Sequence, residues 1–141
     1  MGRRDDFLGD WIEVNIDSYN DDRTAFSFTA SVSDVKSDEF ISNNGDFDTS
    51  WNPIWYLGTQ IDDDGWTAEI RIPLSQLRSG NEEEQVWGLQ STRRYFNNEE
   101  RSVWQPVSAN PPGWVSEFGE LRGLIGLKPQ KQLEIQPYTV A

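Results

Sequence analysis

The stretch that decides the fold is "DWIEVNIDSYNDDRTAFSFTASV", residues 10–32. In its first part, apolar Ile12, Val14 and Ile16 alternate with residues of a different character. A period of two predicts a β-strand with one apolar face and one polar face. The other side of this strand carries Trp11, Glu13, Asn15 and Asp17. That face is either ordinary solvated surface or a surface that binds something.

A partner strand follows directly. The turn-forming residues of "SYNDD", residues 18–22, come next, and Phe26 and Phe28 then occupy alternate positions. Asn and Asp favour turns because their side chains hydrogen-bond nearby backbone amides and because they tolerate left-handed backbone. Residues 10–32 are therefore predicted to form a β-hairpin.

The clearest second hairpin lies in "IWYLGTQIDDDGWTAEIRI", residues 54–72. Asp64–Gly65 marks its turn. The next segment, "PLSQLRSG", predicts one helical turn with Leu74 and Leu77 facing inward. The polar segment 33–53 is expected to be a long loop.

The rest of the chain also predicts short strands and no long helix. These strands are expected over residues 86–96, 101–107, 116–127 and 131–140. Short strands joined by Asn-, Asp- and Gly-rich turns predict an all-β fold, an antiparallel β-sandwich. The chain begins almost inside a strand and ends in an apolar stretch, so we expect a sandwich that is incomplete at its N-terminus.

Composition narrows the possible functions. Lys and Arg number 12 against 24 Asp and Glu, which gives a net charge of -12. Such a surface repels nucleic acid and anionic lipid. Cysteine and histidine are absent, which excludes disulfides, thiolate metal sites, and the Ser-His-Asp, Cys-His and zinc-hydrolase chemistries from this chain alone. Of the common metal ions, oxygen-ligated ones such as calcium remain.

Several landmarks occur in the order found in one known family. "GDWIEVNIDSYNDDRTAFSF" (residues 9–28), "GWTAEIRIPLSQL" (65–77), "VWGLQSTRR" (86–94) and "PPGWVSEFGELRGL" (111–124) resemble carbohydrate-binding module family 9. The likeness is closest to the family-9-like domain at the front of large envelope proteins of Bacteroidetes-type bacteria, whose C-terminal region looks like a membrane β-barrel. The resemblance implies a jelly-roll sandwich over residues 1–126 and a link toward the barrel over 127–141.

The resemblance also implies a function and a place for it. The chain would be a non-catalytic carbohydrate-binding domain in the periplasm or at the outer membrane, with weak affinity for the end of a glycan. Sugar binders of this family hold a terminal sugar between two aromatic platforms, which align with Phe7 and Trp114. Glu13 and Asn15 would bind hydroxyl groups, and Asn110 lies near the family's binding Asn. Asp10 and Asp17 either cap turns or help to bind a structural calcium ion.

Other interpretations stay open. Trp114 can pack within its loop, and Glu13 can sit on a solvated strand face or pair with Arg93 or Arg94. The domain can be a structural cap or plug that binds its own C-terminal barrel region and no ligand, and an exposed sheet edge favours homodimers by strand pairing. A glycosidase needs paired carboxylates across a cleft, for which Glu13 and Glu69 are the candidates.

Overall fold

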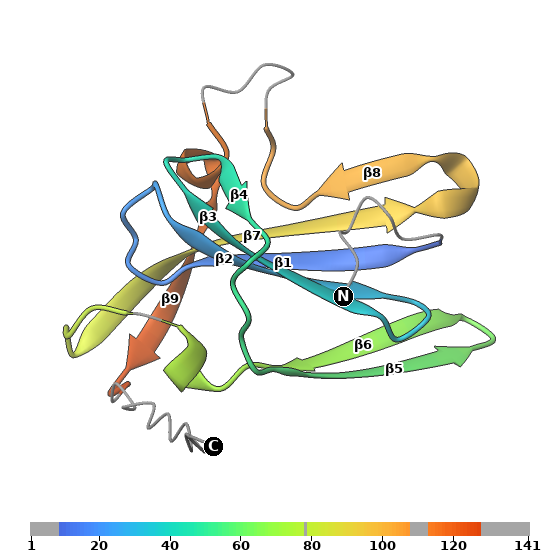
Figure 1. Cartoon of the computed structure of the whole chain (residues 1–141), viewed down its shortest axis with the longest axis horizontal. Coiled ribbons are helices and arrows are strands. Elements are labelled where there is room, and N and C mark those ends of the chain that lie inside the picture. Colours follow the sequence, from blue (N-terminus) through green and yellow to red (C-terminus); the bar gives the residue numbers. More distant parts are fainter. Residues whose placement is uncertain (1–8, 78, 108–112, 128–141) are drawn as a thin grey trace, which may run out of the picture.

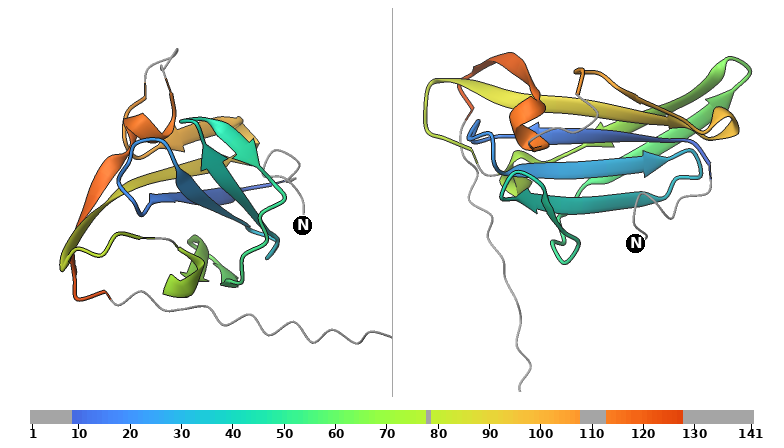
Figure 2. Two further views of the ribbon diagram at one scale, coloured as in Figure 1. Left: turned by 60° about the vertical axis from the view of Figure 1, so that its left-hand side comes forward. Right: turned by 90° about the horizontal axis from the view of Figure 1, so that it is seen from above.

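The computed structural model describes residues 9–77, 79–107 and 113–127, and in these ranges the chain is an antiparallel β-sandwich of two unequal layers (Figures 1 and 2). The prediction of an antiparallel β-sandwich is confirmed, while its jelly-roll type stays a prediction. The helical segments in the described ranges are single 3-10 turns of three residues, Leu74–Gln76, Phe96–Asn98 and Val115–Glu117, so none of them could span a membrane.

The larger layer is a seven-stranded sheet with the order β4-β3-β2-β1-β7-β8, and β9 also pairs with β7. All of its pairings are antiparallel. Its strands are β1 (Trp11–Asp17), β2 (Ala25–Ser31), β3 (Lys36–Ser42), β4 (Asp46–Asp48), β7 (Glu84–Tyr95), β8 (Glu100–Val103) and β9 (Gly119–Ile125). The predicted first hairpin is thus present, and β7 pairs with the other edge of β1.

The smaller layer is the hairpin of β5 (Tyr56–Asp62) and β6 (Gly65–Arg71). Its register pairs Asp62 with Gly65, so the turn residues are Asp63 and Asp64, one position earlier than predicted. Gly65 has φ +150, a value that residues with a Cβ rarely adopt.

The core lies between the two layers. One face of the seven-stranded sheet presents the apolar positions of β1, β2 and β7, and the hairpin and the segment before it cover that face. The buried members of this cluster are Ile16, Phe26, Phe28, Trp55, Leu77 and Trp87. Phe28 meets Trp55 edge-on, with ring centroids 5.2 Å apart, a favourable geometry for aromatic pairs. Leu77 faces inward as predicted, whereas Leu74 is 38% exposed, against prediction.

The prediction of a long loop over residues 33–53 is wrong, because this segment contains β3 and β4. Its period of two is hidden, since polar residues occupy both faces. On the core side, Lys36 Nζ donates to the Trp55 carbonyl oxygen at 2.7 Å, and Asp38 Oδ2 accepts from Trp55 Nε1 at 2.9 Å. Two polar side chains can therefore lie in the core because one tryptophan satisfies both of them.

Candidate functional site

The other face of the seven-stranded sheet is polar and yet closed to solvent. Strands β1, β2, β3 and β7 all contribute to it, and their register places the contributed side chains in adjacent rows. We call this set the polar face. Its members are Glu13, Asn15, Ser27, Thr29, Ser37, Glu39, Gln90 and Thr92, each at most 7% exposed. A face of this composition is unusual, because such residue types are mostly exposed in proteins.

Some members of the polar face have hydrogen-bond partners within the sheet or next to it. Ser27 Oγ donates to Glu13 Oε1 at 3.1 Å. Gln90 holds the backbone of Gln105: its Nε2 donates to the Gln105 carbonyl at 3.0 Å, and its Oε1 accepts from the Gln105 N–H at 2.9 Å. These contacts bring the chain beyond β8 over the polar face.

Two other members, Asn15 and Thr92, have side-chain atoms with no hydrogen-bond partner among the described residues. Among the residues described, the buried polar atoms without a hydrogen-bond partner are Asn15 Oδ1, Asn15 Nδ2, Thr92 Oγ1 and Trp114 Nε1. Asn15 lies opposite Gln90, and Thr92 lies opposite Glu13, in the pairing of β1 with β7. Asn15 and Thr92 are therefore neighbours in adjacent rows. Buried polar groups almost always have a partner, so each exception needs an explanation such as water, an ion or a ligand.

Trp114 lies on the same side of the sheet as Glu13. Its backbone N–H donates to the Asn44 carbonyl at 2.8 Å, and its ring meets Phe118 edge-on at 5.6 Å. Both rings pack against the buried cluster of Ala25, Ile41 and Val115. Ala25 and Ile41 alternate in phase with Ser27 and Glu39, so this cluster lies at one end of the polar face.

The described residues on either side of the 108–112 gap both contact the polar face or its end. Gln105 contacts Gln90 in the middle of the sheet, while Trp114 and Ser116 contact Asn44 beyond the end of β3. Figure 1 shows the orange 3-10 turn of residues 115–117 beside β3 and β4. The indole of Trp114 is half-buried there, and its unpartnered Nε1 is shielded from solvent.

Of the remaining predicted site residues, Asp17 lies on the same side of β1 as Asn15 and is fully buried, and Asp10 precedes this strand. Phe7 and Asn110 lie outside the described residues. Asp10 Oδ1 accepts the Phe96 N–H at 2.7 Å, and Asp17 accepts the N–H groups of Asp21 and Asp22 at 3.3 and 2.9 Å. Both aspartates thus hold the backbone of nearby turns, which is one of the two roles predicted for them.

Asp10 and Asp17 do not fit one shared calcium ion. They lie at opposite ends of β1, about 23 Å apart at about 3.3 Å per residue. In the described ranges, no group of three or more His, Cys, Asp or Glu could hold a metal ion. Burial raises the pKa of Asp17, and the amides of Asp22 and Asp21 oppose this rise. Calcium binding stays a prediction.

Glu13 and Glu69 lie on opposite outer surfaces of the sandwich. Glu13 is on the polar face, which points away from the hairpin. In β6 the half-buried Trp66, Ala68 and Ile70 face the core, and Glu69 alternates with them to the exposed side. This arrangement separates the two carboxylates that the glycosidase alternative requires on one cleft.

Sequence reasoning missed Ser37, Glu39, Gln90 and Thr92. The first two were hidden by the expected loop over 33–53, where no contrast between faces marks the strand. Gln90 and Thr92 lie in a strand that was predicted, but the residue that contacts Gln90, Gln105, follows the next strand and could not be placed from local pattern. The sequence signal that could have found them is their alternation, which places them on the same side of their strands as Glu13 and Asn15 once the strands are paired.

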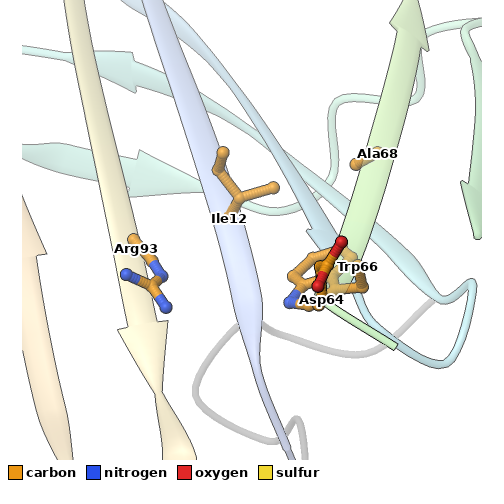
Figure 3. Close-up of a pocket in the computed structure, with 6 residues that line it drawn as sticks. Ile12, Asp64, Trp66, Ala68 and Arg93 are labelled. Carbon is orange, nitrogen blue, oxygen red and sulfur yellow. The ribbon is translucent and has the colours of Figure 1, made fainter. Parts of the chain in front are cut away.

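A separate pocket of about 340 Å³ opens on the core side, between the larger sheet and the tip of the hairpin (Figure 3). It is lined by Ile12, Asp64, Gly65, Trp66, Ala68 and Arg93. Figure 3 shows Arg93 on β7 and Asp64 with Trp66 on the other side of Ile12. The two charged side chains are exposed, and the four unpartnered buried atoms lie elsewhere, so this pocket is a weaker candidate than the polar face.

No known family model and no curated protein matches the sequence. The resemblance to carbohydrate-binding module family 9 therefore stays a prediction. The chemistry of the polar face has to be judged from its own residues.

Proposed function

We propose that the chain is a non-catalytic domain that binds a neutral carbohydrate on the polar face. The observation that supports this most is Asn15, whose amide is fully buried and has no partner among the described residues. An amide offers two donors and an acceptor, and leaving all of them unmade in the interior is costly. A bound polyol supplies both kinds of partner.

The residues of the polar face favour a neutral ligand. None of the residues that form the polar face is Lys or Arg, and the chain as a whole has a net charge of -12, so an anionic ligand would find no cationic partner there. Carboxylates, amides and hydroxyls together match the mixed donors and acceptors of sugar hydroxyl groups. The half-buried Trp114 offers an aromatic surface beside them, which contributes only about 1 kcal/mol beyond area burial. We therefore expect weak binding.

The proposed ligand contacts are Asn15 and Thr92, which lack partners, together with Glu13 and Trp114. Phe7 and Asn110 remain proposed contacts on the strength of the family resemblance alone. The same resemblance supports a place in the periplasm or at the outer membrane.

Heteronuclear NMR with a panel of neutral mono- and oligosaccharides tests the proposal. A binder should shift the Asn15 side-chain amide and the Trp114 indole signals of the wild type, and Asn15→Leu, which has no side-chain amide at position 15, should abolish the shift of the Trp114 indole signal. Asn52→Leu is the matched control, because it makes the same change at an exposed position. If a sugar shifts the Trp114 indole signal equally in the wild type and in Asn15→Leu, the polar face is not the site. If no sugar in the panel shifts the wild-type signals, carbohydrate binding is excluded for that panel.

A structural cap is the second candidate, and the smaller layer favours it. Tyr56 and Ile61 of the hairpin are 52% and 69% exposed, and Ile54, just before it, is 56% exposed. A hairpin of two strands also leaves sheet edges free to pair. Such a cap would bind a β-barrel region of its own protein, or a second copy, through the hairpin. Ile61→Ser should then weaken that association, measured by sedimentation velocity, and leave sugar-induced shifts unchanged.

A further inference from the structure

Another pocket, lined mostly by aromatic residues, lies on the core side of the larger sheet, at the end where β1 leads into β2. It has a volume of about 300 Å³. Its lining residues are Tyr19, Asp21, Thr24, Phe26, Phe40 and Trp51. Phe26 is in register with Ile16 of β1 and faces the core. The sheet therefore separates this pocket from the polar face, and the function proposed above does not use it.

Four aromatic rings from separate parts of the chain surround the pocket. Phe26 is 5% exposed and forms the floor, while Phe40 and Trp51 are half-buried. The ring centroid of Phe26 lies 5.5 Å from that of Phe40 and 5.2 Å from that of Trp51, with interplanar angles of 49° and 45°. Tyr19 is 51% exposed and lies at the rim. Tilted rings present their electron-rich faces from several directions, which is the arrangement that attracts an organic cation.

A carboxylate lies beside these rings. Asp21 Oδ1 accepts the backbone N–H groups of Arg23 and Thr24 at 2.9 and 2.8 Å, and Oδ2 accepts the Thr24 hydroxyl at 2.8 Å. Burial alone would raise the pKa of Asp21, but these hydrogen bonds outweigh it and hold the pKa below its ordinary value. The group is therefore ionised at neutral pH, and its orientation is held by the turn.

The surroundings favour a positive ligand. Of the lining residues that the structure describes, none is Lys or Arg. Asp22 follows Asp21 in the same turn, and the Arg23 side chain is exposed. A bare metal ion would find few oxygen ligands among aromatic rings. An ammonium group with an apolar surface fits both the rings and the carboxylate.

We propose that the pocket formed by Tyr19, Phe26, Phe40 and Trp51 with Asp21 binds an alkylated ammonium group, such as a trimethylammonium headgroup. The rings contact the methyl groups, and the carboxylate neutralises the charge from one side. The shared chemistry includes free choline and methylated amines.

The experiment compares choline with its neutral isostere 3,3-dimethylbutan-1-ol, at matched ionic strength. Both are titrated to tens of millimolar while the indole N–H signal of Trp51, assigned with a Trp51→Phe variant, is followed by NMR. Choline should shift this signal in a saturable way, and the isostere should bind at least several-fold more weakly, because only the cation gains from ring faces and carboxylate.

Two variants test the named residues. Tyr19→Ala and Asp21→Asn should each weaken choline binding by about two- to fivefold. The matched controls are Tyr56→Ala and Asp63→Asn, which change exposed residues of the hairpin and should leave binding unchanged. Asparagine at position 21 keeps an acceptor for the turn amides, and unchanged far-ultraviolet circular dichroism confirms that the variant is folded.

The proposal is overturned if the isostere binds as tightly as choline, which would make the pocket merely apolar, or if choline causes no saturable shift. It is also overturned if the controls weaken binding as much as the test variants. None of these results bears on carbohydrate binding, which is read from different signals on the opposite face of the sheet.

Discussion

Replacing Asn15 by leucine should stabilise the fold, even though it puts an apolar side chain on the polar face. Asn15 is fully buried, and neither polar atom of its amide has a partner among the described residues. The substitution therefore breaks no hydrogen bond of the described structure. Leucine has the same number of side-chain heavy atoms as asparagine in the same branched arrangement, so the change introduces no cavity.

The magnitude follows from the cost of the buried amide. An amide placed in the interior without hydrogen bonds costs about 1–3 kcal/mol. Asn15→Leu removes that cost, so the free energy of unfolding should rise by about 1–3 kcal/mol. For a domain of this size, each kcal/mol corresponds to roughly 3–6 °C in Tm.

Gln90 provides the matched control. It is as buried as Asn15 and lies directly opposite it in the pairing of β1 with β7. Unlike Asn15, it makes two hydrogen bonds to the backbone of Gln105. Gln90→Met keeps the length of the side chain but breaks both bonds, so the free energy of unfolding should fall by about 1–3 kcal/mol.

The assay is equilibrium urea unfolding followed by circular dichroism, with thermal unfolding in parallel. The slope of the free energy against urea should be the same in the three proteins, so that midpoint shifts report stability alone. The reasoning is refuted if Asn15→Leu destabilises the protein as much as Gln90→Met does. In that case the Asn15 amide has partners in solution, and it no longer supports a ligand site.

Two further predictions concern other buried groups. Burial raises the pKa of Asp38, and the hydrogen bond from Trp55 opposes this rise. The folded protein therefore binds the proton of Asp38 more tightly than the unfolded chain does. The stability of the wild type should increase as the pH falls from neutral through the raised pKa toward the ordinary value of 3.8. Asp38→Asn keeps an acceptor for Trp55 Nε1, so it should be more stable than the wild type at neutral pH and lose this advantage below that pH window. Urea unfolding over a pH series measures the difference in stability. A difference that does not change with pH would contradict the prediction. At Gly88, an added Cβ would lie 2.9 Å from Asp17 Cβ. Gly88→Ala should therefore lower the free energy of unfolding by about 1–3 kcal/mol through overpacking. Gly58 has open space around it, so the control Gly58→Ala should change the free energy of unfolding by less than about 1 kcal/mol. Equal midpoints for the two alanine variants in urea would show that the sheet yields at Gly88 without cost.

Much of the local structure is decided by neighbouring residues in the chain. The alternation around Glu13 and Asn15 specifies both β1 and its two faces, because side chains of a strand point alternately to opposite sides. The hairpin of β5 and β6 follows from two alternating runs joined by Asp and Gly, whose backbone preferences suit a tight turn. Signals of this kind need no distant partner, so they can be found without the structure.

The strand β3 shows where local pattern fails. Its residues Lys36 and Asp38 point into the core, and a strand with polar side chains on both faces shows no contrast of hydropathy. What permits them there is Trp55, which comes 17 residues after Asp38 in the chain and offers it an indole N–H. A contact across that separation is fixed by tertiary packing, so the segment looked like a loop.

The sequence by itself determined that Glu13 and Asn15 share a face opposite to the apolar one. Only the tertiary structure decided that this face is buried rather than solvated. β2, β3 and β7 align their polar rows with that of β1, while Gln105 contacts the middle of the face and Trp114 packs at its end. Strand pairing and tertiary contacts join residues far apart in sequence, and no local pattern records which partners meet.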